Sequence, residues 1–136
     1  MKASNQKGAS AIEFAIILPV LVVLLFGMVE FSILLYGKAV NTNASREGAR
    51  AGIVYGDPRL TCEKIGDVVD AYCSNYLITF GAAASAVTTC PTQETYSGGT
   101  LQVKVSYQYD FLVIPNFISS LTDGINLVAT TTMRME

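Results

Sequence analysis

At 136 residues, the chain has room for one ordinary domain plus one additional element. Hydrophobic residues make up 51% of it, the net charge is −2 and the basic residues are scattered, which argues against a nucleic-acid-binding surface. The sequence has no histidine, which removes the commonest metal ligand and the commonest general base at neutral pH. Composition therefore disfavours an enzyme, and we expect no catalytic residues, no metal site and no cofactor.

A basic leader and a long apolar run open the chain. Residues 1–8 carry Lys2 and Lys7 and no acid. The run of 26 residues from Ala11 to Tyr36 spans about 39 Å as a helix, against the roughly 20 residues that cross a bilayer. It is too long for an ordinary secretory signal, so we expect a retained single-pass membrane helix over residues 9–36. The basic leader favours an N-terminus in the cytoplasm, with the rest of the chain outside the inner membrane.

Four residues interrupt the apolar run and are candidates for helix packing or assembly. Glu13 and Glu30 lie near its two ends. A charged acid costs about 2.5–3.5 kcal/mol at the centre of a membrane helix and less near an interface. Both acids are therefore either tolerated near the headgroups or paired when subunits pack together. Pro19 removes one helical hydrogen bond and is expected to kink the helix or melt a turn, and Gly27 permits close approach of a neighbour.

The junction between leader and apolar run resembles the class III prepilin signal of type IV pilins. The likeness is carried by the sequence Lys7-Gly8-Ala9-Ser10-Ala11-Ile12-Glu13-Phe14. The resemblance implies that a prepilin peptidase cuts between Gly8 and Ala9, which leaves Glu13 as the fifth residue of the mature chain. In such pilins this acid is thought to meet the amino terminus of a neighbouring subunit and so to select the register of assembly.

The helical pattern continues past Tyr36 and stops at Gly56-Asp57-Pro58. We therefore expect one helix from about Ser10 to Tyr55, apolar in its first half and amphipathic in its second.

Small residues recur every four positions in the second half of this helix, at Ala44, Gly48 and Gly52. Glycine costs a helix interior up to about 1 kcal/mol against alanine, so such a stripe predicts tight packing. The expected neighbour is the sheet of the head that follows. The alternative is a weak and partly frayed helix.

The same stretch also resembles the TadE-like proteins of tight-adherence (Tad) pilus systems. The likeness rests on the leader with Leu18-Pro19, on Glu30-Phe31 and Leu35-Tyr36, and most specifically on the element Arg46, Glu47, Gly48, Ala49 and Arg50. The closing residues Thr132–Glu136 resemble the end of that family too. The resemblance implies a structural minor pilin (pseudopilin) that a prepilin peptidase processes. It would be stored in the inner membrane and then join other pilin-like subunits, through an inner-membrane assembly platform, in an extracellular or periplasm-spanning filament.

Two other interpretations stay open at this point. The chain is equally competent to be the major subunit of an extracellular filament. It is also compatible with a single-pass membrane protein whose head binds a partner without polymerising. Cleavage after Gly8 discriminates the last of these from the pilin interpretations.

Residues 37–136 predict a small head, in which the first helix continues to about residue 55. A second helix is expected over residues 59–78, and its predicted buried face comprises Cys62, Ile65, Val69, Tyr72, Cys73 and Tyr76. Strands are expected over residues 86–90, 101–111 and 125–135, with connections at residues 81–85, 97–99 and 115–123. The predicted fold class is therefore α+β and type IV pilin-like: a long N-terminal helix, a second helix and a small antiparallel sheet of about three strands.

The head offers no catalytic set, and its cysteines predict one disulfide if it is exported. Cys62 and Cys73 would be about 16 Å apart along one helix, too far for a disulfide. Cys90 is therefore expected to pair with one of them. A strand that returns along the helix favours Cys73–Cys90, and three buried free thiols are the alternative. Asp67 and Asp70 are expected in solvent, whereas Tyr107 and Tyr109 are expected in the core.

Overall fold

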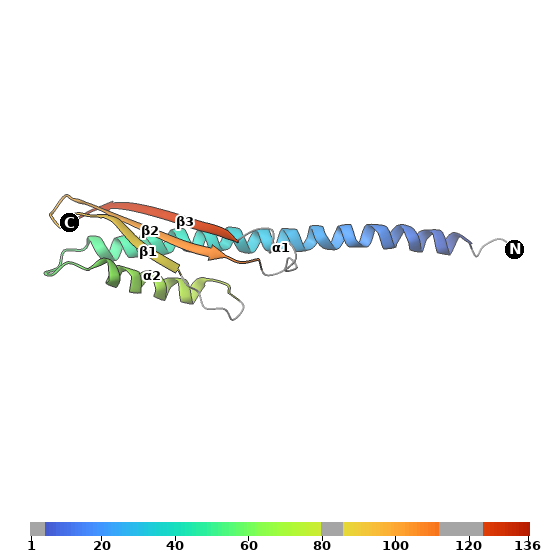
Figure 1. The fold of residues 1–136 in the computed structure, drawn as a ribbon, viewed down its shortest axis with the longest axis horizontal. Helices are drawn as coiled ribbons and strands as arrows, with labels where there is room; N and C mark the ends of the chain where they lie inside the picture. The colour runs from blue at the N-terminus through green and yellow to red at the C-terminus, as the bar shows by residue number, and fades with distance from the viewer. Residues whose placement is uncertain (1–4, 80–85, 112–123) are drawn as a thin grey trace.

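The computed structural model describes residues 5–79, 86–111 and 124–136. Its elements are α1 (Asn5–Ile53), α2 (Cys62–Tyr76), β1 (Ala86–Gln93), β2 (Thr100–Tyr109) and β3 (Ile125–Arg134). The first half of α1 projects from a small head, so the start of this helix and the C-terminus of the chain lie at opposite ends of the molecule (Figure 1). The predicted α+β architecture is confirmed. The connections expected at residues 81–85 and 115–123 fall outside the described residues.

The three strands form one antiparallel sheet in the order β1-β2-β3. β2 and β3 pair along their full length, from Thr100 opposite Arg134 to Tyr109 opposite Ile125. The pairing of β1 with β2 shifts register between Thr89 and Thr92, where Cys90-Pro91 lies. Proline has no N–H to donate to a ladder, so an irregularity is expected there. β1 nevertheless resumes beyond it, and the prediction that this strand ends at Cys90 was too short.

Both helices pack against the same face of the sheet. Along β2, every second side chain is buried on this face, namely Leu101, Val103, Val105, Tyr107 and Tyr109. The second half of α1 lies against β2 and β3, and α2 lies against α1 and β1 (Figure 1). The strict alternation predicted for this strand is therefore confirmed, and the two tyrosines belong to the core as expected.

The small-residue stripe of α1 is where the helix meets the rest of the core. A Cβ atom at Gly48 would lie 2.6 Å from Val69 Cγ2, and one at Gly52 would lie 2.5 Å from Leu101 Cδ2. Ala44, one turn earlier, is fully buried. Close packing was predicted from this spacing and is confirmed, with the addition that α2 is a neighbour as well as the sheet. These residues pack within the chain, so they are not an exposed assembly surface.

Helix α2 is shorter than predicted. Thr61 caps its N-terminus by accepting a hydrogen bond from the Lys64 backbone, and Leu77 follows its last residue. Ile65, Val69 and Cys73 are buried, as expected, whereas Cys62 and Tyr72 are half-buried. The prediction was wrong for Tyr76, which is exposed. It is the last residue of α2, and its ring lies against that of Tyr72, with 4.6 Å between ring centroids, while Tyr72 packs against the core.

The disulfide joins Cys62 to Cys90, and Cys73 is a buried free thiol. The predicted Cys73–Cys90 pairing is therefore wrong. A strand rises about 3.3 Å per residue and a helix only 1.5 Å, so a few residues of β1 run past many residues of α2. Thr88 already lies level with Gly66, where a Cβ atom would lie 3.8 Å from Thr88 Cβ. Two more residues bring Cys90 to the beginning of α2, while the Cys73 side chain points into the core.

Candidate functional site

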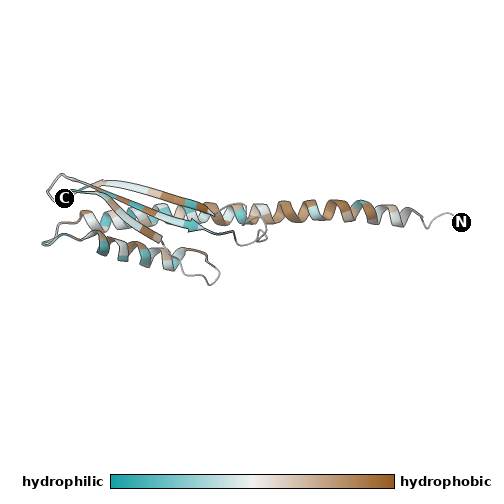
Figure 2. Ribbon diagram, viewed as in Figure 1, coloured by the Kyte–Doolittle hydropathy of each residue, from teal (hydrophilic) through white to brown (hydrophobic). Residues whose placement is uncertain are grey.

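The first half of α1 is exposed on all sides. Every residue from Gly8 to Val29 is exposed in the isolated chain, including Phe14, Leu24 and Phe26. In Figure 2, where the ribbon is coloured by hydropathy, most of this stretch has the colour of hydrophobic residues, whereas the head has mixed colours. The helix that contains it is long and apolar enough to cross a membrane. One such helix at the N-terminus fits a single-pass membrane protein.

Pro19 and Gly27 leave this stretch helical. Residues on both sides of Pro19 are α-helical, so the lost hydrogen bond does not end α1. The melted turn, which was one of the two expected effects of this proline, does not occur. A Cβ atom at Gly27 would meet no other atom within 4 Å. Gly27 therefore offers an open approach to a neighbouring helix, unlike Gly48 and Gly52. Gly8 and Ala9, the expected cleavage site, are exposed residues of α1.

The two glutamates of the apolar run have opposite environments. Glu13 is exposed. Glu30 is 2% exposed, and its Oε1 atom accepts a hydrogen bond from the Tyr109 hydroxyl at the end of β2. Burial and this contact with Glu30 raise the pKa of Tyr109 far above its ordinary value. Glu30 thus has a partner within its own chain, so it is not an exposed contact for a second subunit, whereas Glu13 stays available.

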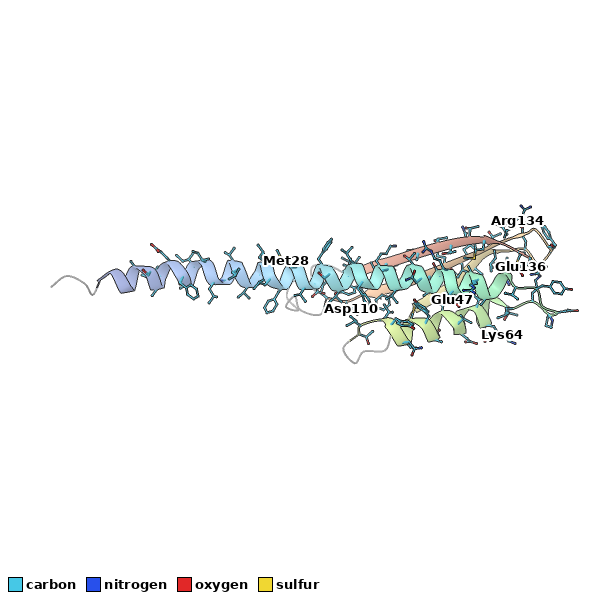
Figure 3. All side chains as sticks on the ribbon, turned by 180° about the vertical axis from the view of Figure 1, so that it is seen from behind. Met28, Glu47, Lys64, Asp110, Arg134 and Glu136 are labelled. Atoms are coloured by element: carbon cyan, nitrogen blue, oxygen red, sulfur yellow. A yellow bond between two sulfur atoms is a disulfide. The ribbon has the colours of Figure 1, made fainter. Side chains whose placement is uncertain are left out.

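The head covers Glu30 because the end of the head nearest the apolar half of α1 folds over this helix. Tyr107, Tyr109 and Leu127 form a second apolar cluster with Ile33 and Leu34 of the helix. In Figure 3, Met28 lies on the projecting part of α1, whereas Asp110 marks this end of the head. Among the described residues, Glu30 of α1 thus already contacts the head, six positions before the boundary expected at residue 36.

Two buried polar residues of α1 fix the helix to the sheet, and the sequence reasoning missed both. Asn41 Nδ2 donates to the backbone oxygens of Val105 (3.2 Å) and Leu127 (2.7 Å), and so joins β2 to β3. Ser45 Oγ lies 2.7 Å from Thr131 Oγ1. Both residues are fully buried. Asn41 lies three positions before Ala44, and Ser45 lies three positions before Gly48, which is a signal that would have placed both on the packed face of the helix.

The family element of residues 46–50 divides into two parts. Gly48 and Ala49 are buried in the core. Arg46, Glu47 and Arg50 are exposed on the outer side of α1, where Glu47 is labelled in Figure 3. The element therefore combines residues that pack the head with charged side chains that face solvent.

The described part of the chain contains no group of three or more metal-ligating side chains of the His, Cys, Asp and Glu types. Asp67 and Asp70 are exposed, as expected. Partial burial and, secondarily, Asp67 raise the pKa of the Asp70 carboxyl. Burial and Asp70 raise the pKa of the Cys73 thiol to about 11, which keeps it protonated at neutral pH and disfavours a nucleophilic role.

Residues 8–50, which comprise the apolar half of α1 and most of its packed half, match the family model described as TadE-like protein. Over these residues the chain is similar to TadE-like proteins. The resemblance predicted from the leader, the proline and the residues 46–50 is thereby confirmed. The match associates the chain with the pilin-like proteins of Tad pilus systems, a structural rather than an enzymatic family. Neither the curated proteins nor the solved structures include a match to this chain.

Proposed function

We propose that this protein is a minor pilin-like subunit of a Tad pilus, acting in adhesion or secretion. The observation that carries the proposal is the apolar half of α1. It is fully exposed in the isolated chain, continues without a break into the packed helix of a small head, and lies within the TadE-like segment. A helix of this kind needs lipid or other helices around it, and in a filament core the other helices come from neighbouring subunits.

Residues 1–8 act as a leader in this proposal. A prepilin peptidase cuts between Gly8 and Ala9, with the leader in the cytoplasm and the head outside the inner membrane. An assembly platform then moves the subunit from the membrane into a filament with other pilin-like subunits. The exchange is between two apolar environments, so burial alone specifies no register. Polar contacts must supply it, and the new amino terminus and the exposed Glu13 are the groups available for such a contact.

Two variants test this proposal. Replacing Gly8 with leucine should block processing and leave a chain that is longer by the residues 1–8 on a denaturing gel. Glu13→Ala should leave membrane insertion and processing intact but reduce incorporation into pili.

Normal piliation in the Glu13→Ala strain would contradict the role given to Glu13. A stable, uncleaved N-terminus in the parent strain would contradict the pilin function itself. It would favour the single-pass protein that binds a partner without polymerising.

A further inference from the structure

The end of the head farthest from the start of α1 carries an open groove of about 640 Å³. One wall is the segment that joins α1 to α2, and the other is the end of β1 with the turn that follows it. The polar or aromatic residues that line it are Tyr55, Asp57, Arg59, Thr61, Gln93, Thr95 and Ser97. Its volume lies within the roughly 300–1,000 Å³ that is usual for small-molecule sites.

The walls of this groove are held in place by contacts beneath them. Arg59 donates to the backbone oxygens of Ile53 (3.3 Å) and Glu136 (2.5 Å), which ties the first wall to the C-terminus. Gln93 Nε2 donates to Leu60 O at 2.7 Å and joins the two walls. The Cys62–Cys90 disulfide joins them again, since Cys62 lines the groove and Cys90 lies on β1. The groove is therefore preformed, which lowers the ordering cost of binding a ligand.

The second wall is pinned as well. The Glu94 carboxylate accepts hydrogen bonds from the backbone N–H (2.6 Å) and the hydroxyl (2.8 Å) of Thr100. These hydrogen bonds hold the pKa of Glu94 below its ordinary value. The Gly98 N–H donates to the backbone oxygen of Met135 at 3.0 Å, which anchors the following turn to the end of the chain.

The groove presents an aromatic ring beside hydrogen-bonding groups that together carry no net charge. Tyr55 is 75% exposed, so its ring is not needed to fill the core. The Arg59 guanidinium lies 5.6 Å from the centre of that ring and helps to orient it. Thr95 and Ser97 are exposed hydroxyls that both donate and accept, and Asp57 is an exposed acceptor. Among the lining residues, one carboxylate balances one guanidinium, so the groove has no net charge to attract a strongly charged ligand.

We propose that this distal groove binds a neutral saccharide of one to three sugar units. A sugar ring has an apolar C–H face, which packs on an exposed tyrosine, and a rim of hydroxyls, which match carboxylate, amide and hydroxyl partners. The groove fits a protein partner less well, because a stable protein interface buries about 800 Å² on each side and the groove alone is too small to supply that area. The inference does not depend on filament assembly, since it requires only the folded head.

Isothermal titration of the full chain tests the proposal. The chain is held in a detergent without a sugar headgroup, such as lauryldimethylamine oxide, and titrated with lactose, cellobiose, mannobiose and diacetylchitobiose. We expect at least one of them to bind with a Kd below about 10 mM. Tyr55→Ala should raise that Kd about tenfold or more. Tyr76→Ala is the matched control, because Tyr76 is an exposed tyrosine outside the groove and its loss should leave the Kd unchanged.

The thermal midpoint of each variant shows whether the head is still folded, and Thr95→Val gives a second, milder change within the groove. Absence of binding by all four saccharides would overturn the proposal, as would an equal Kd for the Tyr55→Ala and Tyr76→Ala variants. Tighter binding of sialyllactose than of lactose would overturn the neutral character of the ligand. A protein that protects Tyr55 from chemical modification while no saccharide binds would also overturn it.

Discussion

The two halves of α1 are one continuous helix with opposite surroundings. Gly27 in the first half has open space where a Cβ atom would be, whereas Gly48 in the second half has Val69 there. Glu13 in the first half is exposed, whereas Glu30, at the boundary, contacts Tyr109 of its own chain. The second half therefore finds its partners within the chain, whereas the first half must find them outside it, in lipid or in other subunits.

The largest loss of stability is expected from removing the disulfide. This loss should be confined to the head, because both cysteines lie there. Cys62→Ala with Cys90→Ala opens a loop with a sequence separation of 28, for which the chain-entropy model gives about 3–4 kcal/mol of lost stability. Thermal unfolding in detergent should show a lower midpoint for the head, while the circular dichroism of the apolar helix persists. A peptide map that joins Cys73 to Cys90 in the parent chain would contradict the structure.

The next largest effect is a difference in head stability between variants of the two glutamates. Glu30→Ala leaves the Tyr109 hydroxyl buried without its acceptor, which should cost the head about 1–3 kcal/mol. Glu13→Ala is the matched control, since this residue is exposed and its loss should leave the unfolding midpoint of the head unchanged. Equal midpoints for the two variants would show that the head does not depend on the contact between Glu30 and Tyr109.

A smaller difference in head stability is expected between the Gly48→Ala and Gly27→Ala variants. Gly48→Ala places a Cβ atom 2.6 Å from Val69 Cγ2, and the overpacking cost of about 1–3 kcal/mol should exceed the helix-propensity gain of up to about 1 kcal/mol. Gly27→Ala meets no atom and should leave the unfolding midpoint of the head unchanged. A Gly48→Ala head that is as stable as the Gly27→Ala head would mean that α1 and α2 are packed less closely than described.

The smallest effect is expected from the ionisation of the buried Cys73 thiol, which leaves the stability of the head unchanged near neutral pH. Its pKa in the folded chain is raised from 9.0 to about 11, so the unfolded chain loses this proton first as pH rises. The contribution of the thiol to stability is therefore complete below pH 9 and is lost between pH 9 and 11. At pH 8, iodoacetamide should label Cys73 only in denaturant. Rapid labelling of the folded chain would place this thiol at the surface.

Sequence patterns predicted the elements and the inward face of β2, because apolar alternation and small-residue spacing are local signals. They also predicted the apolar helix, and the resemblance to TadE-like proteins over residues 8–50 is confirmed. The disulfide partner was missed because it depends on how far β1 runs along α2, which no local pattern records. The contact between Glu30 and Tyr109 was missed for the same reason, since the two residues are 79 positions apart and meet only when the head folds onto α1.

The central claim is that the exposed half of α1 is covered by other pilin-like subunits after its leader is removed. Mass spectrometry of filaments sheared from the cell surface, together with imaging of the same filaments, tests this most directly. We predict that the chain is present in the filaments and that its first residue is Ala9. Filaments that lack the chain, in cells whose membranes hold it with residues 1–8 still attached, would contradict the account.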